Sequence, residues 1–179
     1  MIRRSWLRYY DALPERSNGG YVIQSWDTAS KDGPQNDYSV CTTWMLVNSL
    51  YYLMHVSRGR YEYPELKSTA IALANQFRPH CVLIEDASAG IALAQELRKI
   101  YFGGITTPVA AEKNKVLRVY INQVKFAAGL VLFPKGASFL PELEAELLSF
   151  PQSKHDDLVD SVCQALGHEM AYDTTYSWL

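Results

Sequence analysis

The feature that most constrains the fold is a short, continuously apolar run that ends in a carboxylate. Residues 81–85 read Cys-Val-Leu-Ile-Glu, with no polar residue before Glu85. Such a run is typical of a strand that is covered on both faces, as in the parallel sheets of α/β proteins. Residues 21–26 carry β-branched and aromatic side chains at both parities, and Asp27 follows them. We therefore expect two buried, parallel strands whose carboxyl ends each carry an acid.

The remaining pattern predicts further strands and helices in the order of a mixed α/β layer. Ser39–Val47 and residues 50–57 are strand-like runs on either side of the turn pair Asn48-Ser49, and with residues 21–26 they predict three antiparallel strands. Short strands are expected at residues 106–110 and 130–133. Helices are expected at residues 64–77, 91–100, 113–128, 138–150 and 155–170. The predicted fold class is α/β, with three antiparallel strands, then parallel strands, and flanking helices.

Length and composition fit one folded domain. The chain has 179 residues, of which 48% are hydrophobic and 20% charged, as is usual for a soluble globular domain. Residues 1–20 end in the turn-forming sequence Ser-Asn-Gly-Gly and are interpreted as a lead-in or linker segment. Residues 21–179 are interpreted as the domain itself.

Cysteine content, hydropathy and charge argue against several classes of protein. Cys41, Cys81 and Cys163 are an odd number without a C-x-x-C pair, which favours core positions over disulfides or structural zinc. No apolar run approaches the roughly 18 to 20 residues of a membrane span, and a signal peptide is not evident, so a cytoplasmic location is expected. The formal charge of −2 argues against a free-standing, tight, non-specific DNA binder, but it allows DNA that a partner delivers.

Acidic residues stand at three predicted element ends: Asp27, then Glu85 with Asp86, and finally Asp156, Asp157 and Asp160. In open α/β sheets, ligands gather outside the carboxyl ends of the strands. Crowded carboxylates repel one another and are tolerated most easily when a divalent cation neutralises them. Oxygen-only donors favour Mg²⁺ or Mn²⁺ over zinc. Two such ions, about 3.5 to 4 Å apart, can activate a water and stabilise the leaving oxygen in phosphodiester hydrolysis.

Periodicity alone leaves open which acid of the last helix completes such a site. At about 100° per residue, residues 158, 159, 162, 163 and 166 form one apolar stripe, with Asp156 and Asp160 at its border and Asp157 on the far side. This favours Asp156 and Asp160, although a side chain in the first turn can project past the helix end. Alternatively, these acids only cap the helix and complement its dipole, and Asp27 only caps a turn.

Four segments of the chain together resemble the C-terminal nuclease domain of tailed-phage terminase large subunits. In order, they are residues 26–30, 36–39, 84–90 and 154–161. The resemblance runs from about residue 6 to residue 167 and implies a fold similar to ribonuclease H and Holliday-junction resolvases. It implies a divalent-metal-dependent endonuclease that cuts concatemeric viral DNA during packaging with two Mg²⁺ or Mn²⁺ ions. By motif, Asp27 and Glu85 are metal ligands. The Asp-Asp-x-x-Asp segment points to Asp157 as the third, with Asp160 as a further ligand or supporting group and Asp156 in reserve.

The resemblance also implies partners. Terminase large subunits carry an ATPase motor, and this chain contains no G-x-x-x-x-G-K-[ST] phosphate loop. The motor is therefore expected as a separate part, joined through residues 6–20. Double-stranded DNA, the small terminase subunit and the portal protein are the other partners that the resemblance implies, in the cytoplasm of a bacterial host.

Basic and turn-forming residues are candidates for contacts with DNA. Lys113, Lys115 and Arg118 open the predicted helix at residues 113–128, and the resembling family has a similar Lys-x-x-Arg here. They can hold phosphates near the metals, or form a solvated helix face. Ser88 and Gly90 can present backbone N–H groups to a phosphate, or simply make a tight turn.

The sequence also suggests two assisting residues and leaves two other functions open. His155 and Asp86 are candidates to assist the neighbouring acids. A Holliday-junction resolvase or transposase-like nuclease would use the same carboxylates. A catalytically inactive docking module of the packaging motor would neither bind Mn²⁺ nor cut DNA.

Overall fold

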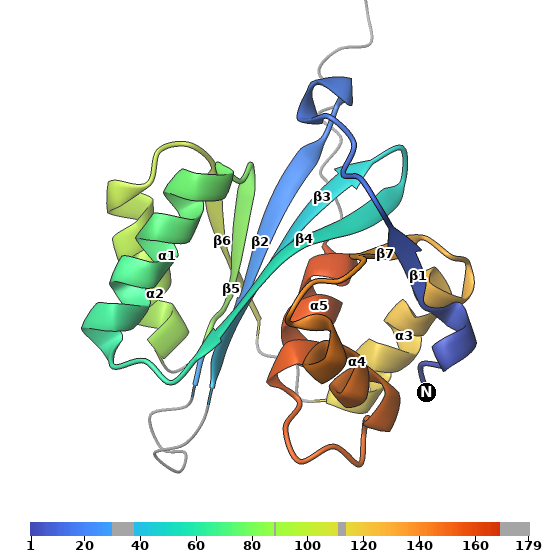
Figure 1. Cartoon of the computed structure of the whole chain (residues 1–179). Coiled ribbons are helices and arrows are strands. Elements are labelled where there is room, and N and C mark those ends of the chain that lie inside the picture. Colours follow the sequence, from blue (N-terminus) through green and yellow to red (C-terminus); the bar gives the residue numbers. More distant parts are fainter. Residues whose placement is uncertain (30–37, 88, 111–113, 169–179) are drawn as a thin grey trace, which may run out of the picture.

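A computed structural model describes residues 1–29, 38–87, 89–110 and 114–168 and shows a seven-stranded mixed sheet with helices on both faces (Figure 1). The strand order across the sheet is β1-β7-β4-β3-β2-β5-β6. The strands are β1 (Arg8–Tyr10), β2 (Tyr21–Asp27), β3 (Ser39–Val47), β4 (Leu50–Gly59), β5 (Cys81–Glu85), β6 (Ile105–Val109) and β7 (Val131–Pro134). The helices are α1 (Tyr63–Phe77), α2 (Ala89–Ile100), α3 (Lys115–Ala127), α4 (Leu140–Ser149) and α5 (Asp157–Gly167). The predicted α/β class is confirmed.

The centre of the sheet is the antiparallel arrangement that the sequence predicted. β2 pairs with β3, and β3 pairs with β4, both antiparallel. Asn48 and Ser49 connect β3 to β4 with φ of 51° and 63°, the left-handed backbone that a tight hairpin turn requires. On the other side of β2, β5 runs parallel to it, and β6 runs parallel to β5. The two apolar runs that end in acids are therefore neighbouring parallel strands, as expected.

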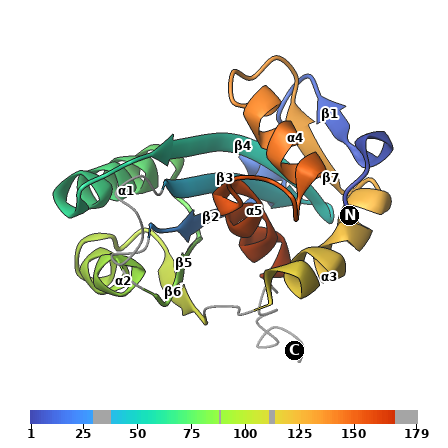
Figure 2. The ribbon, with the colours of Figure 1, turned by 90° about the horizontal axis from the view of Figure 1, so that it is seen from below.

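Different helices cover the two faces of the sheet. α1 and α2 lie on one face, on the left in Figure 1, and α3, α4 and α5 lie on the other, a division that Figure 2 shows from below. On the first face, Trp26 and Ile84 pack against Leu66 and Leu97 in an apolar cluster. On the second face, α5 packs on β2 and β3 and is buried along residues 158–166.

Strand alternation decides which face the two strand-end acids occupy. Trp26 and Ile84 are register partners on β2 and β5, and both belong to the apolar cluster under α1 and α2. The next residues, Asp27 and Glu85, therefore lie on the side of α5. Ser25, two residues before Asp27 and so on the same face of β2, also points toward α5, because its hydroxyl donates to a backbone carbonyl of that helix.

The strand β1 was not predicted by the sequence. It pairs in parallel with β7 at one edge of the sheet, and Ile2 and Leu7 beside it are buried in the core. With three residues, of which one is charged, β1 is too short for its periodicity to stand out. The division at residue 20 into a lead-in segment and a domain stays a prediction.

The structure also tests three smaller predictions, on the last helix, the cysteines and membrane-spanning segments. The last helix, predicted at residues 155–170, begins at Asp157 and ends at Gly167, so Asp156 is its N-cap. Cys41, Cys81 and Cys163 are free and buried, as predicted. Within the described ranges the chain offers no candidate for a membrane-spanning helix, and the longest helix, α1, has 15 residues.

Candidate metal centre

Asp27 and Glu85 end neighbouring parallel strands. Their predecessors Trp26 and Ile84 are paired in register, so the two acids are separated by one strand spacing of about 4.8 Å. Both lie at the carboxyl edge of β2 and β5, where ligands of α/β sheets bind. The structure thus brings together the two acids that the sequence singled out at strand ends.

A buried polar network fixes α5 against β2 and β3. Ser25 Oγ donates to Ser161 O (2.7 Å), and Ser161 Oγ donates to Ser25 O (2.8 Å). The Thr42 N–H donates to Ser161 Oγ (3.2 Å), while Gln164 Nε2 donates to Ser25 Oγ (3.0 Å). These four side chains are buried. Because Asp160 directly precedes Ser161, the network determines where Asp160 stands relative to the strand ends.

The carboxylates of β2, β5 and α5 act on one another electrostatically. Burial raises the pKa of Asp27 well above its ordinary value, and the negative charges of Asp160, Glu85 and Asp157 raise it further, while Lys115 opposes them. A like charge has such an effect when it lies close by. Acids of β5 and α5 therefore lie close enough to Asp27 of β2 for their charges to act on it.

Two basic residues of α3 lie directly on this acid cluster. Lys115 Nζ is 2.5 Å from Asp160 Oδ2 and 2.9 Å from Asp156 Oδ2. Arg118 Nη2 is 2.6 Å from Asp160 Oδ1, and its Nη1 is 4.0 Å from Glu85 Oε1. Partial burial alone would lower the pKa of Lys115, but its hydrogen bonds to Asp160 and Asp156 raise it. The structure thus places Lys115 and Arg118, two of the three predicted bases, beside the predicted acids.

The three acids of the last predicted helix differ in burial. Asp160 is 3% exposed, and both of its oxygens are engaged by bases. Asp156 makes no capping hydrogen bond and its side chain is 36% exposed, whereas the side chain of Asp157 is 21% exposed. The helical wheel placed Asp160 at the border of the apolar stripe, and the structure buries it almost completely. Asp157 and Asp160 both act on Asp27, and the choice of third ligand stays a prediction.

Glu146 of α4 holds the start of α5, a role that the sequence analysis missed. Its Oε1 accepts hydrogen bonds from the N–H groups of Leu158 (2.8 Å) and Val159 (3.3 Å), so the helix is capped from a different helix. Glu146 is 6% exposed and lies beside the buried Leu143 and Leu147 of its own helix. A glutamate on the apolar side of a predicted helix was the available signal. Because Glu146 does the capping, the aspartates at the start of α5 are not needed for it.

Arg58 of β4 is a second residue that the sequence analysis missed. Its guanidinium lies 3.5 Å from Asp157 Oδ2 and 3.6 Å from Glu146 Oε2. It also lies 4.1 Å from the centroid of the Tyr38 ring, whose edge meets the ring of His155 at 5.6 Å. Burial raises the pKa of Asp157, while the charge of Arg58 acts in the opposite direction. The predicted strand ended one residue before Arg58, so no sequence pattern pointed to this residue.

The other predicted site residues surround the turn after β5 or lie outside the described residues. A Cβ at Gly90 would collide with Glu85 O, so only glycine fits where α2 approaches β5. The Gly90 N–H donates to Ala87 O (2.9 Å), and a phosphate contact there would have to replace this bond. Asp86 is exposed next to Glu85. Ser88 and Lys113 lie outside the described residues, and their roles stay predictions.

The acid cluster offers the oxygen donors that a hard cation prefers. In this structure, however, basic side chains lie between the acids and pair with them. In the described parts of the chain, no group of three or more His, Cys, Asp or Glu side chains is arranged so that it could hold a metal. Lys115 and Arg118 pair with these acids instead. The donors are carboxylate oxygens, which suit Mg²⁺ and Mn²⁺. The buried Thr28 Oγ1 has no hydrogen-bond partner among the described residues, and it lies close to Gly90 at the start of α2.

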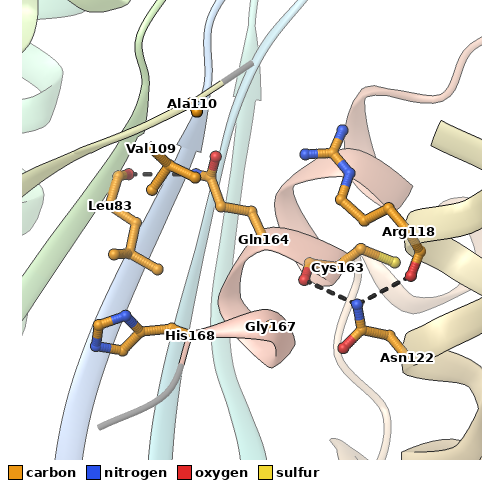
Figure 3. A pocket seen from close by; sticks show the side chains of 9 residues that line it. All are labelled: Leu83, Val109, Ala110, Arg118, Asn122, Cys163, Gln164, Gly167 and His168. Atoms are coloured by element: carbon orange, nitrogen blue, oxygen red, sulfur yellow. Dashed lines mark hydrogen bonds between the residues drawn. The ribbon is translucent and has the colours of Figure 1, made fainter. Parts of the chain in front are cut away.

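A cavity of about 420 Å³ is lined by residues of β5, β6, α3 and α5 (Figure 3), and Arg118 connects it to the acid cluster. Arg118 is common to both, because it lines the cavity and contacts Glu85 and Asp160. Asn122 Nδ2 donates to Arg118 O (3.0 Å) and to Cys163 O (3.4 Å), which joins α3 to α5 at the cavity wall. The lining residues are Leu83, Val109, Ala110, Arg118, Asn122, Cys163, Gln164, Gly167 and His168.

A mixed sheet with acids at the ends of two neighbouring parallel strands, and further acids on a helix packed against them, defines a ribonuclease-H-like nuclease domain. Residues 24–169 match the family described as Terminase RNaseH-like domain, and the chain belongs to this family. The resemblance that the sequence motifs carried is therefore confirmed.

Solved structures of similar fold are terminase nucleases. The large terminase nuclease of thermophilic phage G20c with bound magnesium is 16% identical, with a TM-score of 0.66 over 90% of this chain and 93% of that chain. The human cytomegalovirus terminase nuclease domain, soaked in Mn and with inhibitor bound, is 12% identical, with a TM-score of 0.65 over 92% and 93% of the two chains.

A third similar structure is longer than this chain. It is the large terminase of another thermophilic bacteriophage in complex with ADP, 12% identical with a TM-score of 0.66, and the match covers 89% of this chain but 41% of that chain. The comparison with curated proteins finds no match. At these identities the structural likeness supports the fold, and the family match supports membership among terminase nuclease domains.

Proposed function

We propose that this chain is the nuclease domain of a phage large terminase, and that it cuts concatemeric double-stranded DNA with two Mg²⁺ or Mn²⁺ ions. The observation that carries the proposal is the placement of Asp27 and Glu85 at the carboxyl ends of neighbouring parallel strands, with Arg118 lying between Glu85 and Asp160 of α5. Membership of the terminase family supports a nuclease, and related domains solved with magnesium or manganese support a divalent cation.

Asp27, Glu85, Asp157 and Asp160 are the proposed metal ligands, with Asp156 in reserve. Bound ions would supply an activated water and stabilise the leaving oxygen of the phosphodiester. The protein contributes the placement of these acids: the register of β2 and β5 sets Asp27 beside Glu85, and the contact between Ser161 and Ser25 holds α5 across them. Charge repulsion among the acids favours cations that neutralise them.

Lys115 and Arg118 are the proposed contacts to DNA phosphates, because both pair with Asp160 and so stand directly beside the acids. Lys113, Ser88 and the Gly90 N–H remain candidates for further phosphate contacts, and His155 and Asp86 for assistance to the acids. The net charge of −2 gives the chain little general attraction to DNA. Delivery of DNA by an ATPase domain, with the small terminase subunit and the portal protein, in the host cytoplasm, is part of the proposal.

The test is metal-dependent nicking of supercoiled plasmid by the chain and by Asp27→Ala and Glu85→Ala. We expect nicking with Mn²⁺ and none with chelator, and we expect both variants to lose it because each removes a proposed ligand. Asp11→Ala is the matched control, since Asp11 pairs with Lys135 and follows β1 at the opposite edge of the sheet. Circular dichroism checks that the variants are folded.

Unaltered nicking by Asp27→Ala or Glu85→Ala would refute the ligand assignment. A four-way junction that is cut faster than linear duplex would favour the resolvase-like alternative. Absence of both Mn²⁺ binding and nicking in the unmodified chain would favour an inactive docking module.

A further inference from the structure

Lys115 is bound to the acids that are proposed to hold metal. Its ammonium group contacts Asp160 Oδ2 at 2.5 Å and Asp156 Oδ2 at 2.9 Å. The other oxygen of Asp160, Oδ1, accepts from Arg118 at 2.6 Å. Both oxygens of this buried acid therefore already have a cationic partner.

A divalent ion and the ammonium group cannot use this carboxylate at the same time without repulsion. Mg²⁺ and Ca²⁺ bind carboxylate oxygens at about 2.0 to 2.6 Å, which is the distance range at which the ammonium group now lies from Asp160. Two cations on one oxygen would be separated by only a few ångströms, where like charges repel strongly in a partly buried site. Entry of a metal at Asp160 therefore requires Lys115 to leave.

Lys115 and Arg118 differ in their freedom to move. The side chain of Lys115 is 44% exposed and stands at the first residue of α3, whereas that of Arg118 is 11% exposed one turn later. A lysine on a flexible four-carbon stem can turn toward solvent at little cost. Arg118 is held between Glu85 and Asp160, and its backbone carbonyl accepts from Asn122. Lys115 is therefore the exchangeable cation and Arg118 the fixed one.

We propose that Lys115 is an internal counter-ion that occupies the acid cluster in the absence of metal, leaves Asp160 when a divalent ion enters, and then binds a DNA phosphate. This inference rests on the proposed function and adds to it a coupling between the two ligands. Metal binding makes Lys115 available to DNA, and DNA that holds Lys115 makes Asp160 available to metal. The two effects are equal by thermodynamic linkage.

Titration with Mn²⁺ alone, by calorimetry, tests the first half of the proposal. Lys115→Met keeps the length of the side chain and removes its charge, so we expect it to bind Mn²⁺ about tenfold more tightly than the unmodified chain, since a cation within about 4 Å of a carboxylate shifts its equilibria by this order. Lys115→Arg restores a cation and should return the affinity toward that of the unmodified chain. Lys99→Met is the matched control, because Lys99 is 72% exposed on α2 and its loss changes the net charge equally.

Fluorescence anisotropy with a short labelled duplex tests the second half, with Ca²⁺ as the divalent ion. In the unmodified chain and in Lys99→Met, Ca²⁺ should strengthen duplex binding. In Lys115→Met this gain should be reduced, because the ammonium group that Ca²⁺ releases from Asp160 in the unmodified chain is missing. Thermal melts in chelator verify that each variant is folded.

The possible results separate this inference from the function on which it rests. If the unmodified chain does not bind Mn²⁺, the proposed metal centre fails and the counter-ion role fails with it. If the unmodified chain binds Mn²⁺ but Lys115→Met binds it equally or more weakly, only the counter-ion role is overturned. An undiminished gain from Ca²⁺ in Lys115→Met would overturn the coupling to DNA.

Discussion

Both faces of the sheet pack apolar side chains against their helices, but the α5 face adds more buried hydrogen bonds between strand and helix. Under α1 and α2, Trp26 and Ile84 meet leucines such as Leu66 and Leu97 in an apolar cluster. Under α5, the hydroxyl groups of Ser25 on β2 and Ser161 on α5 each donate to the backbone carbonyl of the other residue, at 2.7 and 2.8 Å.

This difference follows from what each face must position. Apolar packing is non-directional and depends mainly on the area removed from water, so it holds a helix without fixing each atom. Hydrogen bonds have narrow ranges of distance and angle. The helix that carries Asp160 is bonded to the strand that ends in Asp27, whereas α1 carries no proposed ligand and α2 contributes only the Gly90 turn. We infer that the hydrogen bonds of the α5 face align the site, while the apolar packing of the α1/α2 face contributes stability without aligning it.

The largest expected effect is a loss of unfolding free energy on the α1/α2 face that leaves the alignment of the proposed metal ligands intact. Leu97→Ala removes a side chain that is 1% exposed and should cost about 2 to 5 kcal/mol of unfolding free energy, through lost burial and the remaining cavity. Urea denaturation measures this loss. Calorimetry at low temperature should find the Mn²⁺ affinity of the folded variant unchanged. A large loss of Mn²⁺ affinity in folded Leu97→Ala would contradict the division between the faces.

Gln164→Leu, on the α5 face, should reduce the free energy of unfolding by less than Leu97→Ala does, and it should also weaken metal binding. Gln164 Nε2 donates to Ser25 Oγ (3.0 Å) and Trp26 O (3.1 Å), and leaving such buried acceptors unpaired costs about 1 to 3 kcal/mol. Because α5 would lose its alignment on β2, we also expect weaker Mn²⁺ binding, by up to about tenfold.

The matched control for that variant lies on the other face. Gln24 is likewise buried, and its Nε2 donates to Leu73 O of α1 (3.1 Å) and to Thr43 Oγ1 (3.3 Å). Gln24→Leu should destabilise the protein by a similar amount and leave Mn²⁺ affinity unchanged. Equal losses of affinity in both variants would show that alignment is not specific to the α5 face.

The strand-end half of the site was predictable because it depends on local rules. Apolar runs identify buried strands, and adjacent parallel strands bring their carboxyl ends together, so Asp27 and Glu85 followed from the sequence. The antiparallel hairpin at Asn48-Ser49 followed from turn chemistry in the same way. β1 did not, because three residues give no periodic signal, and its place beside β7 is a long-range contact.

The helical half was less predictable because α5 is covered on nearly every side. A helical wheel assumes one apolar stripe and one solvated face, but residues 158–166 are all buried, including Ser161 and Gln164. The angular position of an acid on the wheel therefore says little about its neighbours. Glu146 as a cap, and Arg58 as the partner of Asp157, depend on how α4 and β4 pack against the start of α5.

The smallest expected effect concerns the repulsion between the carboxylates that the fold brings together when no metal is bound. Burial and the nearby carboxylates raise the pKa of Asp27 in the folded protein. A carboxyl group whose folded pKa is raised contributes stability that is fully present below its unfolded value of about 3.9 and is lost as the pH rises through the folded value. In chelator at neutral pH, the Asp27 carboxyl group therefore destabilises the fold.

Asp27→Asn keeps the shape of the side chain and removes this titration. We expect its melting temperature in chelator to exceed that of the unmodified chain by a few degrees at neutral pH, since about 1 kcal/mol moves the midpoint by roughly 2 to 4 °C in a domain of this size. The difference should shrink as the pH falls toward about 4, where the carboxyl group becomes protonated in the unfolded state as well as in the folded state. Added Mn²⁺ should then stabilise the unmodified chain more than the variant. A variant that melts lower than the unmodified chain in chelator at neutral pH would mean that the α5 face gains more from the Asp27 carboxylate than it loses to repulsion.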